Sequence, residues 1–213
     1  MRVLVGPRID LLGDTKEVEV ARAVAGSDDG VVSLREVGVG NLSRLLTQAE
    51  VALLREALSE GERTTKVGYV CKGIGLGGAQ NTRAGDTDRE QVQVVAVIDH
   101  AHLTWRSPLV GPNDERIGPR FPSMDGVYEP EVVTERVAAV GGIILRQGVV
   151  AGVGDDRRLN AYETSTVDIH GHVAASSELV PVVIVAAHMG LHVAAAVVTK
   201  GGSQEEETDC GRS

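Results

Sequence analysis

The stretch that decides the fold spans residues 107–124 and reads Ser107-Pro108-Leu109-Val110-Gly111-Pro112-Asn113-Asp114-Glu115-Arg116-Ile117-Gly118-Pro119-Arg120-Phe121-Pro122-Ser123-Met124. It holds four of the seven prolines of the chain and its only phenylalanine. Proline fixes φ and glycine frees it, so the stretch predicts a long shaped loop rather than a helix or a central strand. Loops of this length are usually functional or disordered. The apolar anchors Trp105, Phe121 and Met124 favour a functional or interface loop.

Outside this loop, the composition predicts an α/β fold. The chain has 213 residues, enough for one domain with a sizeable core. Hydrophobic residues make up 42% of the chain and aromatic residues only 2%, so the core must be built from valine, alanine, leucine and isoleucine. Interiors of this kind suit buried sheets flanked by helices.

Charge and cysteine content limit the partners and the compartment. The net charge of −9 and the isoelectric point of about 5.2 argue against nucleic acid or an anionic membrane surface as a standing partner. No apolar run reaches the roughly 18 residues of a membrane span, and the N-terminus lacks a signal-peptide pattern. Cys71 and Cys210 lie far apart in sequence, so a disulfide framework is not expected. The sequence therefore predicts a cytoplasmic protein.

Hydrophobic periodicity and chain breakers predict alternating strands and helices. Strands are expected at 2–5, 31–34, 67–71, 92–98, 143–153 and 192–199, and helices at 43–60, at 129–140 and from 165 onward. We expect one domain over residues 1–202. A polar, acidic tail at 203–213 is expected to be disordered.

Glycine-rich segments follow two of the expected strands. Gly38 and Gly40 precede the helix expected at 43–60. Backbone N–H groups at such turns can hold an anion or a ribose hydroxyl, although many α/β proteins use them only to enter a helix. Residues 72–79 contain a G-x-G-x-G-G pattern, but a dinucleotide fold would place it beside the first strand. A dinucleotide site is therefore disfavoured.

Three segments resemble the purine nucleoside phosphorylases of the trimeric type. They are Asp99-His100 with the loop at 107–124, the triplet Tyr162-Glu163-Thr164, and residues 176–191. The resemblance extends from residue 3 to residue 199 and is strong over 99–124 and 162–191. It implies a single α/β domain with a mixed central sheet flanked by helices, assembled as a homotrimer. It also implies a helix around 182–187, where propensity alone would predict a strand.

The resemblance implies that Glu163 binds the purine base. A carboxylate accepting a hydrogen bond from a purine N–H would contribute roughly 1.5–3 kcal/mol. The alternative for Glu163 is a glutamate at a helix N-terminus, favoured by the helix dipole. The loop after Asp99 is implied to reach the site of a neighbouring subunit. The implied substrate contacts are Tyr162, Glu163, Ser177, Gly77, Gly78, His100 and Phe121.

The phosphate site that the resemblance implies is altered in this chain. Its implied residues are Gly6, Arg8, Gly38 and Gly40, together with Ser177-Glu178 where the family has methionine and serine. A carboxylate at Glu178 would repel phosphate. Lys200 stands where the family polarises the purine N7, and its ammonium group could donate there; the alternatives are a surface charge for Arg8 and the first residue of the tail for Lys200. The candidate catalytic residues are Glu163, Lys200, Glu178 and Asp99, the last two as bases for water.

These features predict an enzyme that acts on the N-glycosidic bond of a purine-type nucleoside, by phosphorolysis, by hydrolysis or in a recruited reaction. No cofactor is expected, and phosphate is the candidate co-substrate. One alternative is a nucleoside-binding protein without catalysis. Another is a metallohydrolase, because the histidines come in pairs that share a face: His100 and His102, His170 and His172, His188 and His192. Our expectation is that there is no metal site.

Overall fold

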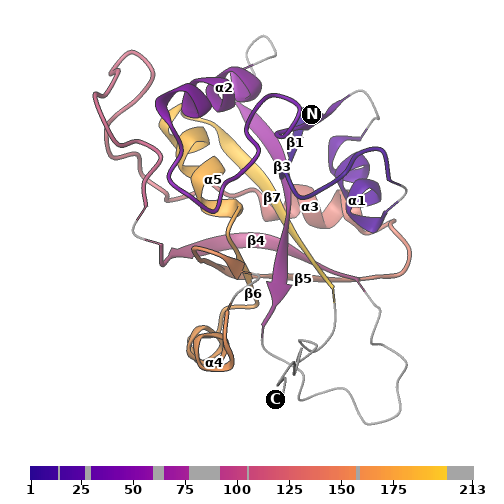
Figure 1. Ribbon diagram of the computed structural model, residues 1–213. Helices are drawn as coiled ribbons and strands as arrows, with labels where there is room; N and C mark the ends of the chain where they lie inside the picture. Colours follow the sequence, from indigo (N-terminus) through magenta and orange to yellow (C-terminus); the bar gives the residue numbers. More distant parts are fainter. Residues whose placement is uncertain are drawn as a thin grey trace, which may run out of the picture.

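A computed structural model describes residues 1–13, 15–26, 30–59, 65–76, 92–104, 106–156 and 159–200. Within these residues the chain forms a single α/β domain (Figure 1). In chain order the elements are β1 (Val3–Val5), α1 (Lys16–Ala25), β2 (Val31–Ser33), α2 (Gln48–Ser59), β3 (Lys66–Gly75), β4 (Val92–His102), α3 (Pro130–Val137), β5 (Ile143–Gly152), α4 (Ala161–Ile169), β6 (Ala174–Ser176), α5 (Leu179–His188) and β7 (His192–Lys200).

The strands form one mixed sheet, as the resemblance implied. Their order is β2-β1-β3-β6-β5-β4-β7, with a further pairing between β3 and β7. That extra pairing closes β3, β6, β5, β4 and β7 into a ring, to which β1 and β2 are attached. The β3–β6 and β4–β7 pairs are antiparallel, and the other pairs are parallel. Closure leaves few unpaired edges on the central strands.

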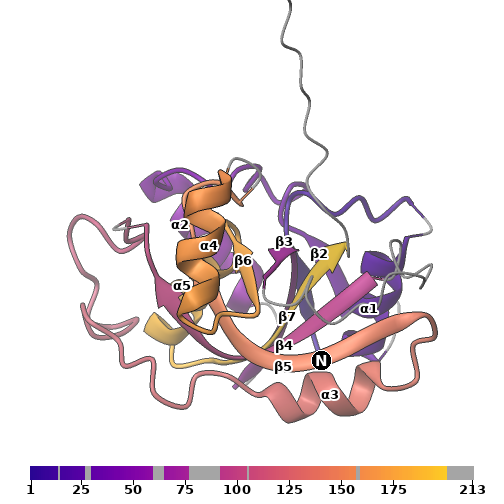
Figure 2. The same ribbon diagram turned by 90° about the horizontal axis from the view of Figure 1, so that it is seen from below.

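Side chains that alternate along the central strands form two cores, one on each face of the sheet. In β4, Val95 and Val97 join the core under α2 and α5, whereas Val94 and Ala96 join the core under α1 and α3. Side chains two apart share a face of a strand, so one valine-rich strand serves both cores. Figures 1 and 2 show the two pairs of helices on their respective sides of the sheet. The aromatic-poor composition is thus sufficient for a closed interior.

The helix expected at 43–60 begins later than predicted. It starts at Gln48, because Thr47 and Glu50 cap one another. The hydroxyl of Thr47 accepts from the N–H of Glu50 at 3.2 Å, and the Glu50 carboxylate accepts from the N–H of Thr47 at 2.9 Å. This reciprocal capping box fixes the first turn. Residues 43–47 therefore form a loop, and residues 43–46 line the pocket described below.

Two strands run further than the sequence suggested. β3 continues through Gly75, so residues 72–75 of the glycine pattern are strand rather than turn. A Cβ on Gly73 would lie 2.5 Å from the carbonyl oxygen of Ala175, which explains why glycine occupies this strand position. β4 continues to His102, past Asp99, through a register shift between Val97 and Asp99. Such a bulge redirects the side chains that follow it.

The remaining elements agree with the sequence except in their bounds. α3 ends at Val137 rather than near 140, and α4 begins at Ala161 rather than at 165. The stretch containing 182–187 is helical, as the resemblance implied, and forms α5. α1 and β6 were not indicated by the sequence patterns. Residues 201–213 lie outside the described residues, and no described helix is long and apolar enough to cross a membrane.

The stretch 107–124 forms a loop without helix or strand, as predicted. It packs along α2 and α5, at the left edge of the view in Figure 1. Asn113 donates to the carbonyl of Gly118 at 3.1 Å, and its amide oxygen lies 3.0 Å from Nε2 of His188, the last residue of α5. The side-chain amide of Gln48 donates to the carbonyl of Val110. The loop is therefore attached to both helices.

Candidate functional site

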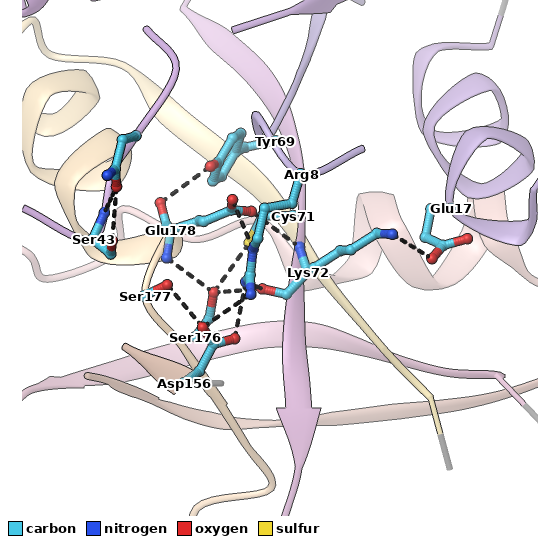
Figure 3. A network of polar contacts seen from close by, with 11 residues as sticks. Arg8, Glu17, Ser43, Tyr69, Cys71, Lys72, Asp156, Ser176, Ser177 and Glu178 are labelled. Atoms are coloured by element: carbon cyan, nitrogen blue, oxygen red, sulfur yellow. Dashed lines mark hydrogen bonds and ion pairs between the residues drawn. The ribbon is translucent and has the colours of Figure 1, made fainter. Parts of the chain in front are cut away.

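The charged centre of the site is Arg8, on the turn that follows β1. Its guanidinium donates to the two carboxylate oxygens of Asp156 at 3.0 and 2.9 Å and to the carbonyl of Lys72 at 2.7 Å. Its Nε lies 2.9 Å from Oε1 of Glu178, forming an ion pair. The side chains of Asp156 and Glu178 are 0% and 3% exposed, and that of Arg8 is 21% exposed. One arginine thus forms ion pairs with two buried carboxylates (Figure 3).

The fold brings these residues together from distant parts of the chain. Asp156 follows β5, and Glu178 lies between β6 and α5. The turn after β1 comes close to Glu178 because Gly6 has no side chain: a Cβ there would lie 2.4 Å from Oε2 of Glu178. Gly6, which the resemblance places in the phosphate site, makes room for a carboxylate in this structure.

Two buried serines extend the network. The hydroxyl of Ser177 donates to Oδ1 of Asp156 at 2.8 Å. The hydroxyl of Ser176 donates to the carbonyl of Lys72 at 2.7 Å and accepts from the N–H of Glu178 at 3.2 Å. Buried polar groups require such partners. We call Arg8, Asp156, Ser176, Ser177 and Glu178 the Arg8 cluster.

The Arg8 cluster carries more negative than positive charge when its groups are ionised. Burial raises the pKa of Glu178 above its ordinary value, and Arg8 offsets part of that rise. Burial also opposes the charged form of Arg8, yet the carboxylates of Glu178 and Asp156 raise the pKa of Arg8 above its ordinary value. Arg8 is therefore positively charged in the folded protein, with two acidic partners for one cation.

A small pocket that is open to solvent lies beside the Arg8 cluster. It is lined by Leu42, Ser43, Arg44, Leu45, Leu46, Thr104, Arg106, Pro108, Gly152, Val153, Ser176, Ser177, Val180 and Pro181. Ser176 and Ser177 belong to both the pocket and the Arg8 cluster, so the pocket wall is hydrogen-bonded to the charges behind it. Apolar walls with a few convergent polar groups are typical of small-molecule sites.

Hydrogen bonds hold the two loops at the mouth of the pocket. Arg106 donates to the carbonyl of Ser43 at 2.5 Å, which joins the loop before α2 to the loop after β4. Arg44 donates to both carboxylate oxygens of Glu50 at 3.0 and 2.6 Å. Hydrogen bonding from Arg44 lowers the pKa of Glu50 to about 2, so this pair stays ionised at neutral pH. The mouth is thus formed by one paired arginine and by Arg106.

Glu163, the residue expected to bind the base, is the third residue of α4. Its carboxylate accepts from the N–H of Asn160 at 2.9 Å, and its own N–H donates to the Asn160 side chain at 2.9 Å. This capping box corresponds to the alternative interpretation, a glutamate at a helix N-terminus. Glu163 is exposed and does not line the pocket described above.

Other expected site residues are spread over the surface. Tyr162 and Phe121 are 81% and 85% exposed. Asp99 is exposed on β4, where its carboxylate accepts from the N–H of His100 at 2.7 Å. The imidazole of His100 lies 2.8 Å from the hydroxyl of Tyr128, and burial lowers its pKa. None of these residues lines the pocket.

The remaining expected site residues are the glycines of the turns and Lys200 at the end of β7. Gly38 has a positive φ of 92°, in the turn between β2 and the loop that lines the pocket, and Gly40 is exposed in the same segment. Lys200 is the last residue of β7, and its backbone pairs with Val92 and Ile74. Gly77 and Gly78 lie outside the described residues.

The paired histidines do not converge on a metal. Among the described residues, no group of three or more histidine, cysteine, aspartate or glutamate side chains is placed to hold an ion. His102 contacts Thr104, His172 contacts the carbonyl of Val167, and His192 contacts the carbonyl of Gly126. Each of these rings therefore has a local partner within its own chain.

Sequence reasoning missed Asp156, Ser176, Ser43 and Arg106. Asp156 follows a valine-rich strand, and acidic residues at strand ends are frequent site residues, so this signal was present in the sequence. The apolar spacing predicts Ser43 within a helix, and Arg106 precedes the loop 107–124. No local pattern distinguishes either residue.

Comparison with known proteins gives the same family as the sequence motifs. No protein-family model matches the chain. Purine nucleoside phosphorylase 1 of Bacillus subtilis (strain 168) is 32% identical over 120 residues, which are 54% of this chain and 42% of that protein. Purine nucleoside phosphorylase 1 of Geobacillus stearothermophilus is 35% identical over 111 residues, 49% of this chain and 39% of that protein. The chain thus matches about two-fifths of the length of these curated relatives.

Solved structures agree on the fold. Purine nucleoside phosphorylase of Schistosoma mansoni in complex with adenosine has a TM-score of 0.55 at 21% identity, covering 76% of this chain and 56% of that one. Isoform 2 from the same organism, in complex with cytosine and ribose-1-phosphate, has a TM-score of 0.58 at 21% identity, covering 72% and 53%. The expected resemblance is confirmed: the chain is purine nucleoside phosphorylase-like in fold and, over about half its length, in sequence.

Proposed function

We propose that this purine nucleoside phosphorylase-like chain acts on the N-glycosidic bond of a purine-type nucleoside, with water rather than phosphate as the acceptor. The observation that carries the proposal is the Arg8 cluster. Arg8 is the cation expected to bind phosphate, and its guanidinium is already bound by Asp156, Glu178 and the carbonyl of Lys72. The relatives' names supply the substrate class.

Phosphate would enter this arrangement at a high electrostatic cost. It would have to displace Asp156 or Glu178 from Arg8, and the displaced carboxylate would remain buried without a cation. Two like charges a few ångströms apart in a poorly solvated interior repel strongly. Neutral water meets no such repulsion.

The same charges favour the transition state of glycosidic cleavage. As the base departs, the sugar becomes an oxocarbenium-like cation, and catalysis requires stabilisation of charge that develops in the transition state. Asp156 and Glu178 together with one arginine give the wall behind Ser177 a negative excess. Ser177, hydrogen-bonded to Asp156 and lining the pocket, is the group we place against the sugar.

Assembly is the second part of the proposal. The exposed aromatic ring of Phe121, in a loop attached to α2 and α5, supports the expected homotrimer in which that loop meets a neighbouring subunit. Sedimentation of the purified protein tests this. A trimeric mass supports the expectation, and a monomer at micromolar concentration contradicts it.

Glu163 allows base recognition to be separated from helix capping. Glutamine also serves at the third position of a capping box, so Glu163→Gln keeps the cap and removes the charge. If Glu163 binds the purine, this variant should bind nucleoside about 10- to 100-fold more weakly with little loss of stability. Asn160→Ala should lose about 1 kcal/mol of stability from the cap and keep its affinity. Thermal unfolding and nucleoside titration of both variants test this. If Glu163→Gln binds nucleoside as tightly as the parent, Glu163 does not bind the base.

The reaction is tested with a panel of purine nucleosides, with base release followed in phosphate-free buffer and with added phosphate. The proposal predicts release that does not increase with phosphate. Release only with phosphate contradicts water as the acceptor. Neither release nor binding of any nucleoside contradicts the function as a whole.

One observation favours a second candidate, nucleoside binding without turnover. Neither Asp156 nor Glu178 lines the pocket, so no described carboxylate faces the place where water would attack. A nucleoside that raises the melting temperature without being cleaved would support this alternative.

A further inference from the structure

We propose that the nucleoside taken by this pocket carries an anionic oxygen group on its sugar, and that Arg106 binds this group. The inference rests on the proposed function for the nucleoside itself. It adds a feature of the substrate and a residue that selects for it.

Among the residues that the structure describes, Arg106 has no acidic partner, unlike Arg44, the other arginine that lines the pocket. Arg44 is paired with Glu50, Arg8 with Asp156 and Glu178, and Arg116 with Asp114. For Arg106, the hydrogen bond recorded among the described residues runs from its guanidinium to the backbone carbonyl of Ser43. An arginine has five N–H donors, so this one contact leaves most of them available to a ligand. Arg106 lines the pocket and is an exposed residue.

The N-terminal turn of α5 lies beside the same pocket and contributes Val180 and Pro181 to its lining. Ser43 and Thr104 also line the pocket, with hydroxyls that are hydrogen-bonded to Asn41 and His102. No side chain caps the N-terminus of α5. The positive end of its dipole therefore acts in the same direction as the arginine.

The opposing charges lie deeper in the protein. Asp156 and Glu178 are buried behind Ser177, whereas Arg106 is exposed. The pocket consequently has a negative excess behind its inner wall and an uncompensated cation at its mouth. A neutral nucleoside would use only the inner end. A nucleoside with a negatively charged group on the far side of the sugar would use both ends, because each end meets the opposite charge.

The experiment measures the binding of inosine, inosine 5′-monophosphate, and inosine in the presence of inorganic phosphate, by calorimetry at low and moderate salt. The protein variants are the parent, Arg106→Gln, Arg106→Lys and Arg120→Gln. Arg120 is a matched control, since it is an exposed arginine on the same loop that donates to one backbone carbonyl, that of Gly111, and does not line the pocket.

We expect the monophosphate to bind about 10- to 100-fold more tightly than inosine to the parent and to Arg120→Gln. The advantage should disappear in Arg106→Gln, survive in part in Arg106→Lys, and weaken with salt. Equal affinity for inosine and its monophosphate overturns this inference and leaves the proposed function standing. An advantage that persists in Arg106→Gln also overturns it. If inorganic phosphate increases the affinity for inosine, and only in proteins that keep Arg106, then free phosphate fills the site. This result overturns the inference that the anionic group belongs to the substrate. Failure of both inosine and its monophosphate to bind contradicts the proposed function as well.

Discussion

Replacing Arg8 with methionine is expected to lower the free energy of unfolding by about 3 kcal/mol. The change removes the cation and leaves Asp156 and Glu178 buried without it. Breaking one side of a buried ion pair typically costs about 3–5 kcal/mol, and the lower end applies because the Arg8 side chain is 21% exposed. Urea unfolding at neutral pH measures the loss.

The loss in Arg8→Met should shrink as the pH falls. Burial raises the pKa of Glu178 in the folded state, and removing Arg8 removes the interaction that offsets this rise. A carboxyl group whose pKa is raised by folding favours the folded state at low pH, and that contribution is lost as the pH rises through the folded pKa. The variant should therefore approach the parent as the pH falls toward the ordinary pKa of glutamate, about 4.3.

Arg120→Met is the control for this prediction. Arg120 is exposed and contacts one backbone carbonyl, so its replacement should change the stability by less than about 0.5 kcal/mol at any pH. An Arg8→Met variant as stable as this control, or with a loss that does not depend on pH, would mean that Arg8 does not neutralise the buried carboxylates.

Replacing Gly118 with alanine is the second change with a large expected effect. A Cβ on Gly118 would lie 1.8 Å from the carbonyl oxygen of His188, the last residue of α5, so the loop 107–124 must move away from the helix. Overpacking of this kind costs about 1–3 kcal/mol. The displaced loop should also lose the contact between Asn113 and His188.

Urea unfolding and limited proteolysis of the loop measure this effect. We expect cleavage within 107–124 at a protease concentration that leaves the parent intact. Gly141→Ala is the matched control, since a Cβ there meets no atom within 4 Å and its φ is not in the left-handed region. If Gly118→Ala and Gly141→Ala are equally stable and equally resistant, the loop is not held against α5 by this close approach.

Much of the fold could be predicted from local sequence. The prolines and glycines of 107–124 predicted a shaped loop, and the valine-rich runs predicted most of the strands. The errors lie where hydrogen bonds override periodicity. Residues 43–47 continue the apolar spacing of α2, yet the capping box of Thr47 and Glu50 starts the helix after them, at Gln48. β3 extends through its glycines because β6 and β7 pair with it there.

The candidate site was less predictable, because its contacts are non-local. Arg8 and Asp156 are 148 positions apart, and no spacing rule connects them. Ser177 and Glu178 were identified only through the resemblance, and Asp156 was not identified. The alternative for Glu163, a glutamate at a helix N-terminus favoured by the helix dipole, matches its place at the third position of α4, where the structure adds a capping box with Asn160. The sequence thus pointed to Arg8 and Glu178, but neither to Asp156 nor to the pairing of these charges.

The identity of the sugar product tests the central claim most directly. Purified protein is incubated with a purine nucleoside that it cleaves, in the presence of inorganic phosphate, and the products are followed by phosphorus NMR and by sugar analysis. The account predicts free pentose and an unchanged phosphate signal, because Asp156 and Glu178 occupy the cation that phosphate would need. Formation of a sugar 1-phosphate in amounts equal to the released base would contradict it.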